Sequence, residues 1–441
     1  MYPSSGLQTA LNAMREASIS EGKMFHQYVP MVTDTTGIDT WAVPILDTSN
    51  LNVMNDFVGL LKKVVYTAVY NKTFNNPLAE LEGDRLPLGN FIEDVYVNPQ
   101  QGVGYDPNDF VGLLEKYESE VAVENLHVNN DVQFKVTLTR DKIRNAFTSW
   151  SNLESFISGL INSLYNGAYI RRYQATKGLV TSALHGNNVQ YEVIDPVTDE
   201  QTARDLVRRL RATFAKMQIP STKYNAWNKV KGGKMALQCW SNPEDLIVLI
   251  SADIESLVDV EALSRAFNLS YADFLGRVIT VDDFSIYNRD GSVAVDGSNI
   301  VCAILDRSWF KIKTQDFAMD EFFNPNVRCW TYFLNDTRME NFSLFGQGLV
   351  LTTEAPTVNA TKIEAESATA TVAVGSKVVV PFELTPPNAT TTVTASSSAE
   401  GKATVEVKGK TVEITGVDDG NATITLTAGG VTDTISVTVT A

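Results

Sequence analysis

Residues 153–168 read LESFISGLINSLYNGA, and their apolar side chains recur at a helical spacing. The apolar positions are Leu153, Phe156, Ile157, Leu160, Ile161, Leu164, Tyr165 and Ala168. Steps of three and four residues place all of them on one face of an α-helix. Ser151 or Asn152 can cap its start, because short polar side chains accept hydrogen bonds from the first free amides. Extended to about Leu184, the helix spans roughly 50 Å, and its three internal glycines allow a kink.

A long arm is predicted before this helix, over residues 75–139. Its first part, NNPLAELEGDRLPLGNFIEDVYVNPQQGVGYDPND, is dense in Gly, Pro, Asn and Asp. Alternating apolar residues flank it, with Leu86 and Leu88 before and the run from Val132 to Leu138 after. Such alternation is typical of strands with one apolar face. A two-stranded arm buries little within its own chain and needs a partner surface.

The remaining elements before residue 350 mix helices and strands without a regular order. Helical spacing predicts helices over residues 7–20, 259–276 and from Thr198 to Pro220, where Thr198 and Gln201 have the spacing of a capping box, and a helical or mixed run over 51–70. Strands are predicted in SNPEDLIVLI (241–250), in GRVITVDDF (276–284), and as short strands between 300 and 350. The stretch RDGSVAVDGSNIVCAILD (289–306) predicts a hairpin with two Asp-Gly turns. This order is typical of an α+β domain.

The chain changes character at about residue 356. All six Trp, all fifteen Tyr and nineteen of the twenty Phe precede this point, whereas residues 357–441 hold one aromatic, Phe382, and nineteen Thr. Residues 351–360 are the predicted linker. About seven short strands follow, near 362–366, 371–384, 391–397, 403–407, 411–415, 422–427 and 431–440. This spacing predicts an all-β immunoglobulin-like sandwich.

Composition excludes several classes of function. The chain has 441 residues and a formal net charge of −16, so it gains no counterion-release energy from wrapping DNA, and we expect no sequence-specific nucleic-acid binding. No apolar run is long enough to cross a membrane, and the first residues do not have the pattern of a signal peptide. Cys239, Cys302 and Cys329 are odd in number and widely spaced, which predicts free thiols in a reducing cytosol.

No catalytic motif is present. The three histidines, His26, His127 and His185, lie far apart, without a nucleophile signature or metal-ligand spacing nearby. We therefore predict no catalytic, cofactor-binding or metal-binding residues, no cofactor, and no enzymatic activity. An enzyme with a distributed site remains a third hypothesis, which a convergent pocket of titrating residues would revive.

The charged clusters also have plain structural interpretations. Glu93-Asp94, Asp282-Asp283 and Asp418-Asp419 are predicted to be solvated turn residues, since neighbours in a strand point to opposite faces. The sequence around Asp290-Gly291 is predicted to be a hairpin turn and not a calcium loop. The arginines at 204, 208, 209 and 211 are predicted to pair with a neighbouring subunit or to face solvent, with phosphate binding as the alternative.

Four segments, in order, resemble the major capsid protein of the phi29-type short-tailed (podovirus) phages. They are NNPLAELEGDRLPLGNFIEDVYVNPQ (75–100), AFTSWSNLESFISGLINSLYNGA (146–168), VDVEALSRAFNLSYADFLGRVITVDDF (258–284) and LDRSWFKI (305–312). The segments VAVGSKVVVPFELTPPNAT and GKTVEITGVDDGNATITLTA in the tail are similar to a bacterial immunoglobulin-like domain of group 2.

The resemblance implies the Hong Kong 97-type capsid fold for residues 1–350, followed by an immunoglobulin-like domain over 361–441. The implied parts are an N-terminal arm (1–50), an extended loop lying across a neighbouring subunit (75–139), a spine helix (151–184), an axial domain (195–300) and a return to the peripheral domain (300–350).

The implied function is that of a major capsid protein, which self-assembles through pentamers and hexamers into the icosahedral or prolate head shell around a double-stranded DNA genome. It is implied to reside in the virion after assembly in the host cytoplasm. Its expected partners are other copies of itself, a separate scaffolding protein and a portal protein, with no membrane. The alternative is a surface adhesin or carbohydrate-binding protein acting through residues 361–441, and weak host-surface contact through that tail stays open.

Overall fold

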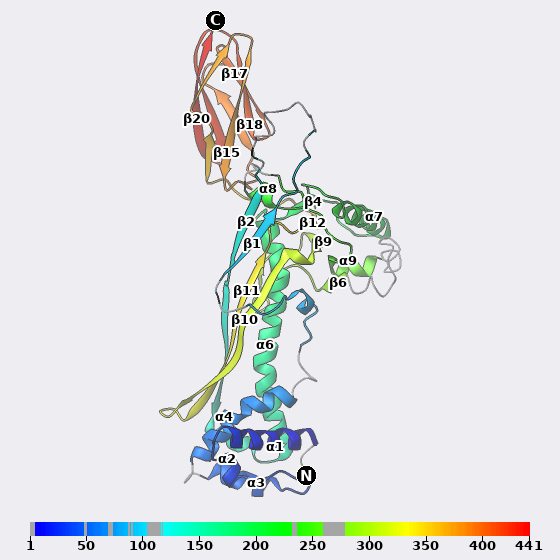
Figure 1. Ribbon diagram of the computed structural model, residues 1–441, viewed down its shortest axis with the longest axis vertical. Helices are drawn as coiled ribbons and strands as arrows, with labels where there is room; N and C mark the ends of the chain where they lie inside the picture. The colour runs from blue at the N-terminus through cyan, green and yellow to red at the C-terminus, as the bar shows by residue number, and fades with distance from the viewer. Residues whose placement is uncertain are drawn as a thin grey trace. The chain divides into compact units, whose positions relative to one another are not determined.

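The protein is described by a computed structural model, shown in Figure 1. The structure describes residues 5–47, 51–68, 74–86, 89, 91–102, 104, 116, 118–231, 236–258 and 278–441. The chain divides into two compact units. The first is made of 1–91, 127–175 and 312–340; the second is made of 92–126, 176–311 and 341–441. The predicted helix over 259–276 lies outside the described residues, as does much of the predicted arm between 103 and 117.

The first unit begins with four helices. They are α1 (Ser5–Ser20), α2 (Phe25–Tyr28), α3 (Ile38–Leu46) and α4 (Leu51–Ala68). Their apolar faces meet around Trp41, which is 1% exposed and lies within 6.4 Å, between ring centroids, of Phe25, Phe57, Phe147 and Trp150. The helix predicted over 7–20 is confirmed, and the run over 51–70, predicted to be helical or mixed, is helical over its described part, Leu51–Ala68. Aromatic contacts of this kind add to the burial of apolar area that holds the helices together.

A three-stranded sheet completes the first unit, in the order β10-β11-β3. Its strands are β10 (Phe310–Asn324), β11 (Cys329–Phe342) and β3 (Asn130–Thr139). The alternating run from Val132 to Leu138 therefore pairs with β11 and not with a strand of the arm, so that part of the arm prediction is wrong. Antiparallel pairing places Phe134 opposite Leu334, and a period of two sends both toward the core.

Helix α6 (Trp150–His185) is preceded by the short helix α5 (Arg140–Ala146). Its 36 residues confirm the long helix that the apolar stripe predicts. Leu153, Ile157, Leu160 and Leu164 are each at most 7% exposed. At Gly178, an added Cβ would lie 2.6 Å from Cδ1 of Ile286, so this glycine permits close packing despite its low helix propensity.

The second unit contains a five-stranded mixed sheet in the order β4-β12-β9-β5-β6. The strands are β4 (Gln190–Val193), β12 (Gly348–Thr352), β9 (Ile300–Asp306), β5 (Leu246–Ser251) and β6 (Val278–Val281). Strands β5 and β9 are buried along their whole length, as continuous apolar runs predict. The predicted strands in SNPEDLIVLI and GRVITVDDF are thereby confirmed.

Helix α7 (Glu200–Met217) packs its apolar stripe against this sheet. The capping box is formed by Asp199 and Thr202, one residue later than the predicted pair Thr198 and Gln201. Asp199 accepts from the amide of Thr202 at 2.8 Å, and its own amide donates to the Thr202 hydroxyl at 3.1 Å. A carboxylate is also stabilised by the positive N-terminal end of a helix, which favours Asp199 over Thr198 as the N-cap residue. Two shorter α-helices, α8 (Trp227–Val230) and α9 (Ala252–Leu257), also belong to this unit.

The predicted hairpin over 289–306 is only half correct. Its first Asp-Gly turn joins β7 (Ile286–Tyr287) to β8 (Val293–Val295), which pair antiparallel. The second turn instead leads into β9, which pairs with β5 and β12 in the main sheet. The expectation of short strands between 300 and 350 is also wrong, since β10 and β11 have 15 and 14 residues.

The C-terminal residues form two facing four-stranded sheets. The first sheet, in the order β13-β15-β18-β17, contains β13 (Lys362–Ala365), β15 (Lys377–Thr385), β18 (Thr411–Gly416) and β17 (Ala403–Lys408). The second, in the order β14-β20-β19-β16, contains β14 (Thr369–Ala373), β20 (Val431–Thr440), β19 (Gly420–Ala428) and β16 (Val393–Ser397). The sandwich is as predicted, with Phe382 in its core. However, the single strand expected over 371–384 is two strands in different sheets, separated at Gly375 with a φ of +76°.

Candidate functional site

A hairpin within the predicted arm has one apolar face that the described structure leaves uncovered. It consists of β1 (Phe91–Val97) and β2 (Val121–His127), which pair with each other as a two-stranded sheet. Exposure alternates along both strands, so the two faces differ. The outer face carries four valines, Val95 and Val97 (both 56% exposed), Val121 (48%) and Val123 (40%). The exposed Phe91, Glu93, Asn125 and His127 lie on the same face, toward the other end of the two strands. We call the four valines the valine face.

The inner face of the hairpin is attached to its own unit by specific hydrogen bonds. The phenol of Tyr96 donates to the carbonyl of Gln238 at 2.6 Å, and burial raises the pKa of that phenol. Asn98 donates to the carbonyl of Ala236 at 3.1 Å and accepts from the amide of Gln238 at 2.9 Å. The ring of Tyr96 also lies 5.7 Å from that of Phe345. These contacts fix which face of the hairpin points outward.

Two carboxylates on the inner face add polar anchors. Asp94 pairs with Lys311 at 2.5 Å. Glu124 accepts from the hydroxyl of Ser343 at 3.1 Å and from the amide of Leu344 at 3.2 Å, and desolvation by burial raises the pKa of Glu124 despite these bonds. The neighbouring Glu93 is exposed on the opposite face, as the alternation predicts.

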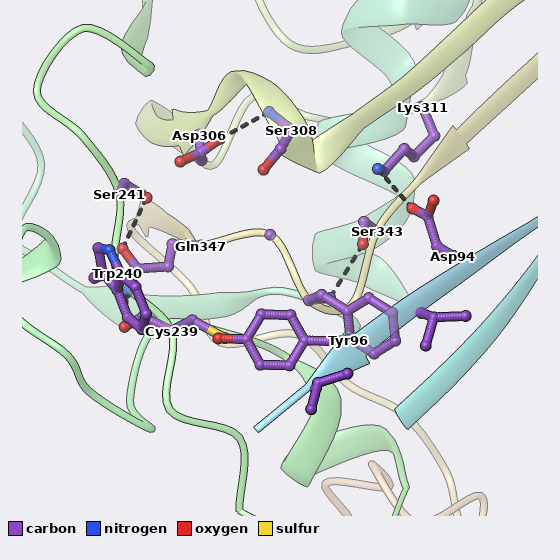
Figure 2. Close-up of a pocket in the computed structure, with 14 residues that line it drawn as sticks. Asp94, Tyr96, Cys239, Trp240, Ser241, Asp306, Ser308, Lys311, Ser343 and Gln347 are labelled. Atoms are coloured by element: carbon purple, nitrogen blue, oxygen red, sulfur yellow. Dashed lines mark hydrogen bonds and ion pairs between the residues drawn. The ribbon is translucent and has the colours of Figure 1, made fainter. Parts of the chain in front are cut away.

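A pocket of about 530 Å³ lies along β1 and is lined by residues of both faces of that strand, from Asp94 to Val97 (Figure 2). Its lining includes Tyr96, the half-exposed ring of Trp240 and the buried thiol Cys239, whose pKa is raised by burial. The polar groups of the lining are mostly paired with one another, as with Ser241 and Gln347 at 2.9 Å. This pairing is typical of a structural junction and does not present converging reactive groups.

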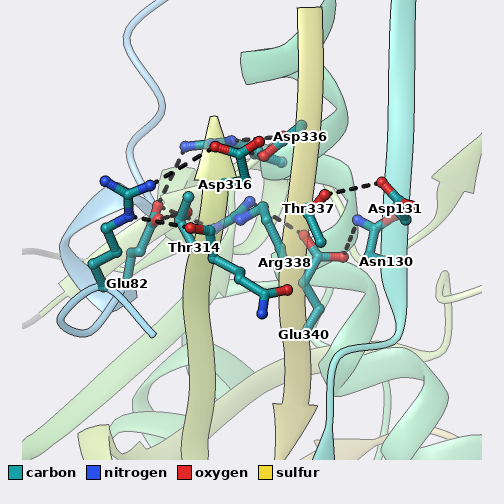
Figure 3. Close-up of polar contacts among 12 residues, drawn as sticks. Glu82, Asn130, Asp131, Thr314, Asp316, Asp336, Thr337, Arg338 and Glu340 are labelled. Atoms are coloured by element: carbon teal, nitrogen blue, oxygen red, sulfur yellow. Dashed lines mark hydrogen bonds and ion pairs between the residues drawn. The ribbon is translucent and has the colours of Figure 1, made fainter. Parts of the chain in front are cut away.

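A cluster of buried charges forms the second part of the site, within the first unit (Figure 3). Asp336, Arg338 and Glu340 alternate along β11 and therefore share its buried face. Arg172 from α6 binds Asp336 with two parallel bonds, Nε to Oδ2 at 2.9 Å and Nη2 to Oδ1 at 2.7 Å. Such forked pairs are both strong and directional.

Both chain segments that lead to the hairpin are attached to this cluster. On the outgoing side, Glu82 lies 3.0 Å from Nη2 of Arg338 and 3.6 Å from Nη1 of Arg172. On the returning side, Asn130 donates to Oε2 of Glu340 at 2.7 Å, and the amide of Glu340 donates to Asn129 at 2.9 Å. We call the set Glu82, Asn130, Arg172, Asp336, Arg338 and Glu340 the arm-root cluster.

The surroundings disfavour the charged form of some groups of the arm-root cluster and favour it in others, as their pKa shifts indicate. Burial lowers the pKa of Arg338 and raises that of Glu340, because both charged forms lose hydration. Burial also disfavours the charge of Arg172, but the forked bond to Asp336 outweighs it, so the pKa of Arg172 is raised. Asp336 is therefore the principal partner of Arg172. The positive charge of Arg338 is balanced by the carboxylates of Glu82 and Glu340 together.

The structure does not bring the three histidines together. The ring of His26 lies 3.2 Å from the hydroxyl of Ser18, but that hydroxyl donates to the carbonyl of Lys23 and accepts from the amide of His26, so it serves the turn after α1. His127 is at the end of β2, 6.2 Å from the ring of Phe91. His185 ends α6. Among the described residues, no group of three or more His, Cys, Asp or Glu is placed to hold a metal ion.

Two acidic pairs were misjudged from sequence. Glu93 and Asp94 lie within strand β1 and not in a turn, and Asp94 is paired with Lys311. Asp282 and Asp283 are not simply solvated, because both bind the ammonium of Lys177, at 2.6 and 3.3 Å, whose side chain is 1% exposed. By contrast, Asp418 is an exposed turn residue paired with Lys402 at 2.6 Å, and Asp290 accepts from Ser292 in a hairpin turn, both as predicted.

Three of the four arginines of α7 pair within their own chain, and Arg211 is exposed. Arg204 pairs with Glu200, Arg208 with Asp205 and Arg209 with Glu192, all with exposed side chains. The three cysteines are buried free thiols, as predicted. Within the described ranges, no helix combines the length and apolarity needed to cross a membrane.

Solved structures identify the class to which this fold belongs. The capsid structure of Staphylococcus phage Andhra contains a chain that matches 65% of this protein and 86% of its own length, with a TM-score of 0.53 at 16% identity. A chain in a structure of bacteriophage P68 covers 64% of this protein and 86% of its own length, with a TM-score of 0.50 at 16% identity. The fold is that of a Hong Kong 97-type phage capsid subunit, followed by an immunoglobulin-like domain.

Sequence comparisons then give the family. Residues 11–352 match the model for the phi29-like phage major capsid protein, and residues 359–439 match the bacterial Ig-like domain (group 2). The major capsid protein of Bacillus phage PZA is 29% identical over 326 residues, covering 73% of this chain and 68% of that protein. That of Streptococcus phage Cp-1 is 26% identical over 303 residues, covering 66% and 80%.

The chain therefore belongs to the phi29-like phage major capsid protein family. It is a component of the virion and self-assembles into the head shell.

Proposed function

We propose that the valine face of the β1–β2 hairpin is the surface through which the arm binds a neighbouring copy in the shell. The observation that carries this proposal is the alternation of the hairpin. Its inner face is tied to the same unit through Tyr96, Asn98 and Glu124, whereas four valines on the outer face are 40–56% exposed. An apolar strip held outward gains free energy when a second subunit covers it.

We also propose the family's roles for the other parts of the capsid domain. Of residues 75–139, the part before β3 acts as the extended loop; α6 acts as the spine helix over about 151–184, residues 195–300 as the axial domain and 300–350 as the return to the peripheral domain. Residues 1–50, predicted as an N-terminal arm, contribute α1 to α3 to a helical cluster. The arm-root cluster supports this assignment, because it ties both ends of the extended loop to β11 and α6.

The test replaces Val95, Val97, Val121 and Val123 with Thr, which keeps the β-branched shape and removes apolar area. We expect a folded subunit that forms few or no shells in negative-stain images and sediments as small species. A control replaces the exposed valines Val374, Val379 and Val417 of the immunoglobulin-like domain with Thr and should assemble normally. Normal shells from the hairpin variant, with unchanged stability, would show that the valine face is not an assembly surface.

We also propose the partners expected of a subunit of this family. A separate scaffolding protein directs shell size during assembly in the host cytoplasm, and a portal protein occupies one vertex. We propose no catalytic activity, because the polar groups beside the hairpin are mostly paired with one another. Co-expression with a scaffolding protein from the same genome should convert irregular assemblies into uniform closed shells; unchanged irregular assemblies would contradict the scaffold proposal.

For residues 361–441, we propose an appendage that assembly does not require. Weak contact with a host surface is the second function open to it, and a glycan array probed with residues 357–441 would test that contact. Shells that fail to form after deletion of residues 357–441 would contradict the appendage proposal.

A further inference from the structure

A turn of the immunoglobulin-like domain meets the C-terminal end of α6. The turn follows β15 and contains Asn388, and the facing segment is Gly186 to Asn188; both belong to the same compact unit. Asn388 is 7% exposed and Asn187 is 5% exposed. Buried asparagine side chains need hydrogen-bond partners, because an unpaired buried amide group destabilises the folded state.

The two segments exchange hydrogen bonds in both directions. The side-chain amide of Asn187 donates to the carbonyl of Asn388 at 2.6 Å. In return, the side-chain amide of Asn388 donates to the carbonyl of Gly186 at 2.6 Å and to Oδ1 of Asn188 at 2.8 Å. Both hydrogens of the Asn388 amide are therefore used. These bonds fix the turn in position and in orientation relative to the end of the helix.

The end of α6 is shaped to present these groups. Asn187 has a φ of +53°, and its amide bonds to the carbonyl of Leu184 at 2.8 Å, while the amide of Asn188 bonds to that of Ala183 at 2.7 Å. This pair of bonds is the Schellman motif, in which Gly or Asn takes the left-handed position. The motif closes the helix but leaves the carbonyl of Gly186 to be satisfied, and Asn388 does so.

The linker is also held on both sides of Pro356. Before it, the amide of Thr353 donates to the carbonyl of Asn299 at 2.8 Å. After it, Val358 and Thr390 are joined by two bonds of 2.8 Å, one from each amide, and the amide of Ala360 donates to the Thr391 hydroxyl at 2.8 Å. A chain tied so close to both ends has little freedom to swing.

We infer that Asn388 latches the immunoglobulin-like domain onto the C-terminal turn of α6, so that the domain is a fixed projection of the subunit and not a tethered, mobile one. The interaction surface is Gly186 to Asn188, and its partner is the turn around Asn388 of the same chain. This inference is independent of the role proposed for the valine face.

The test measures a distance across the latch in the full-length chain. Spin labels are attached at Ala212→Cys on α7 and Thr423→Cys on β19, both exposed positions, while the native cysteines are buried. We expect one narrow distance distribution in the parent chain. Asn388→Ala should broaden it at least twofold, and so should Asn187→Gly, which keeps the left-handed backbone and removes only the amide.

The matched control is Asn421→Ala, at an exposed position of β19, which should leave the distribution narrow. Circular dichroism establishes that each variant is folded, and the Asn187→Gly variant addresses the case in which Asn388→Ala misfolds the turn. A broad distribution in the parent chain would overturn the latch, and so would distributions that stay narrow in both folded asparagine variants.

Discussion

The replacement Arg338→Met tests the arm-root cluster most directly. The side chain of Arg338 is 2% exposed and faces Glu82 at 3.0 Å and Glu340 at 3.1 Å, whose side chains are 25% and 9% exposed. Met keeps the length and apolar bulk of the side chain but removes its charge. Glu340 is then left as a buried carboxylate without its compensating cation.

The expected loss follows from what is left unpaired. Removing one partner of a buried ion pair destabilises a protein by about 3–5 kcal/mol. Water reaches Glu82, which is a quarter exposed, so we expect the lower end, about 3 kcal/mol. The measurement is urea unfolding of the full-length chain followed by far-ultraviolet circular dichroism, with hydrogen exchange of β11 peptides to locate the loss.

A control and a double variant separate this explanation from others. Arg204→Met removes an exposed arginine whose side chain is 68% accessible and paired with Glu200, so its loss should stay within about 0.5 kcal/mol. Glu82→Gln combined with Arg338→Met should lose about 1–2 kcal/mol less than the two single losses added together, because the two groups interact. Additive losses, or a loss for Arg338→Met as small as that of the control, would refute the reasoning.

Two further predictions concern single residues of the helices. Desolvation lowers the pKa of Lys229 from 10.5 to about 8, so between pH 8 and 10.5 the unfolded chain binds more protons than the folded chain, and the destabilising contribution of this lysine falls as pH rises. Lys229→Met should therefore raise the free energy of unfolding by about 1 kcal/mol at pH 7. Thermal unfolding at several pH values would contradict this if the gain did not shrink above pH 8. Gly159→Ala should stabilise α6 by about 0.5–1 kcal/mol, since an added Cβ there meets nothing within 4 Å. Gly178→Ala should stabilise it less, because an added Cβ there would collide with the side chain of Ile286. Equal gains in thermal unfolding would contradict the packing argument.

Long, periodic elements could be predicted from the sequence because their burial is decided locally. The stripe of α6 is one such case, and the alternation of Phe382 with Val380 and Leu384 in the tail is another. Strand partners could not be predicted in this way. The run from Val132 to Leu138 has the pattern of any half-buried strand, and its true partner, β11, lies about 200 residues further along the chain.

The arm-root cluster was missed although a signal for it exists. From Tyr332 onward, alternate residues are Leu334, Asp336, Arg338 and Glu340, so an apolar period of two continues in charged residues. A strand that is buried on one face places these charges inside, where they require partners. The partners themselves, Glu82 and Arg172, cannot be read from the sequence because nothing local links them to β11.

Two kinds of interaction stabilise the buried face of β11, apolar contacts in its first half and ion pairs in its second. At Leu334 the contacts are apolar, and at Tyr332 a hydrogen bond from the hydroxyl to the carbonyl of Val58 adds to the apolar contacts, so the stability there depends on temperature and denaturant. From Asp336, two residues after Leu334, the contacts are ion pairs, and stability there depends on pH because burial raises the pKa of Glu340, the partner of Arg338. Because the folded chain binds a proton at Glu340 more readily than the unfolded chain, mild acid should leave the returning end of the extended loop attached to β11 and should not release it.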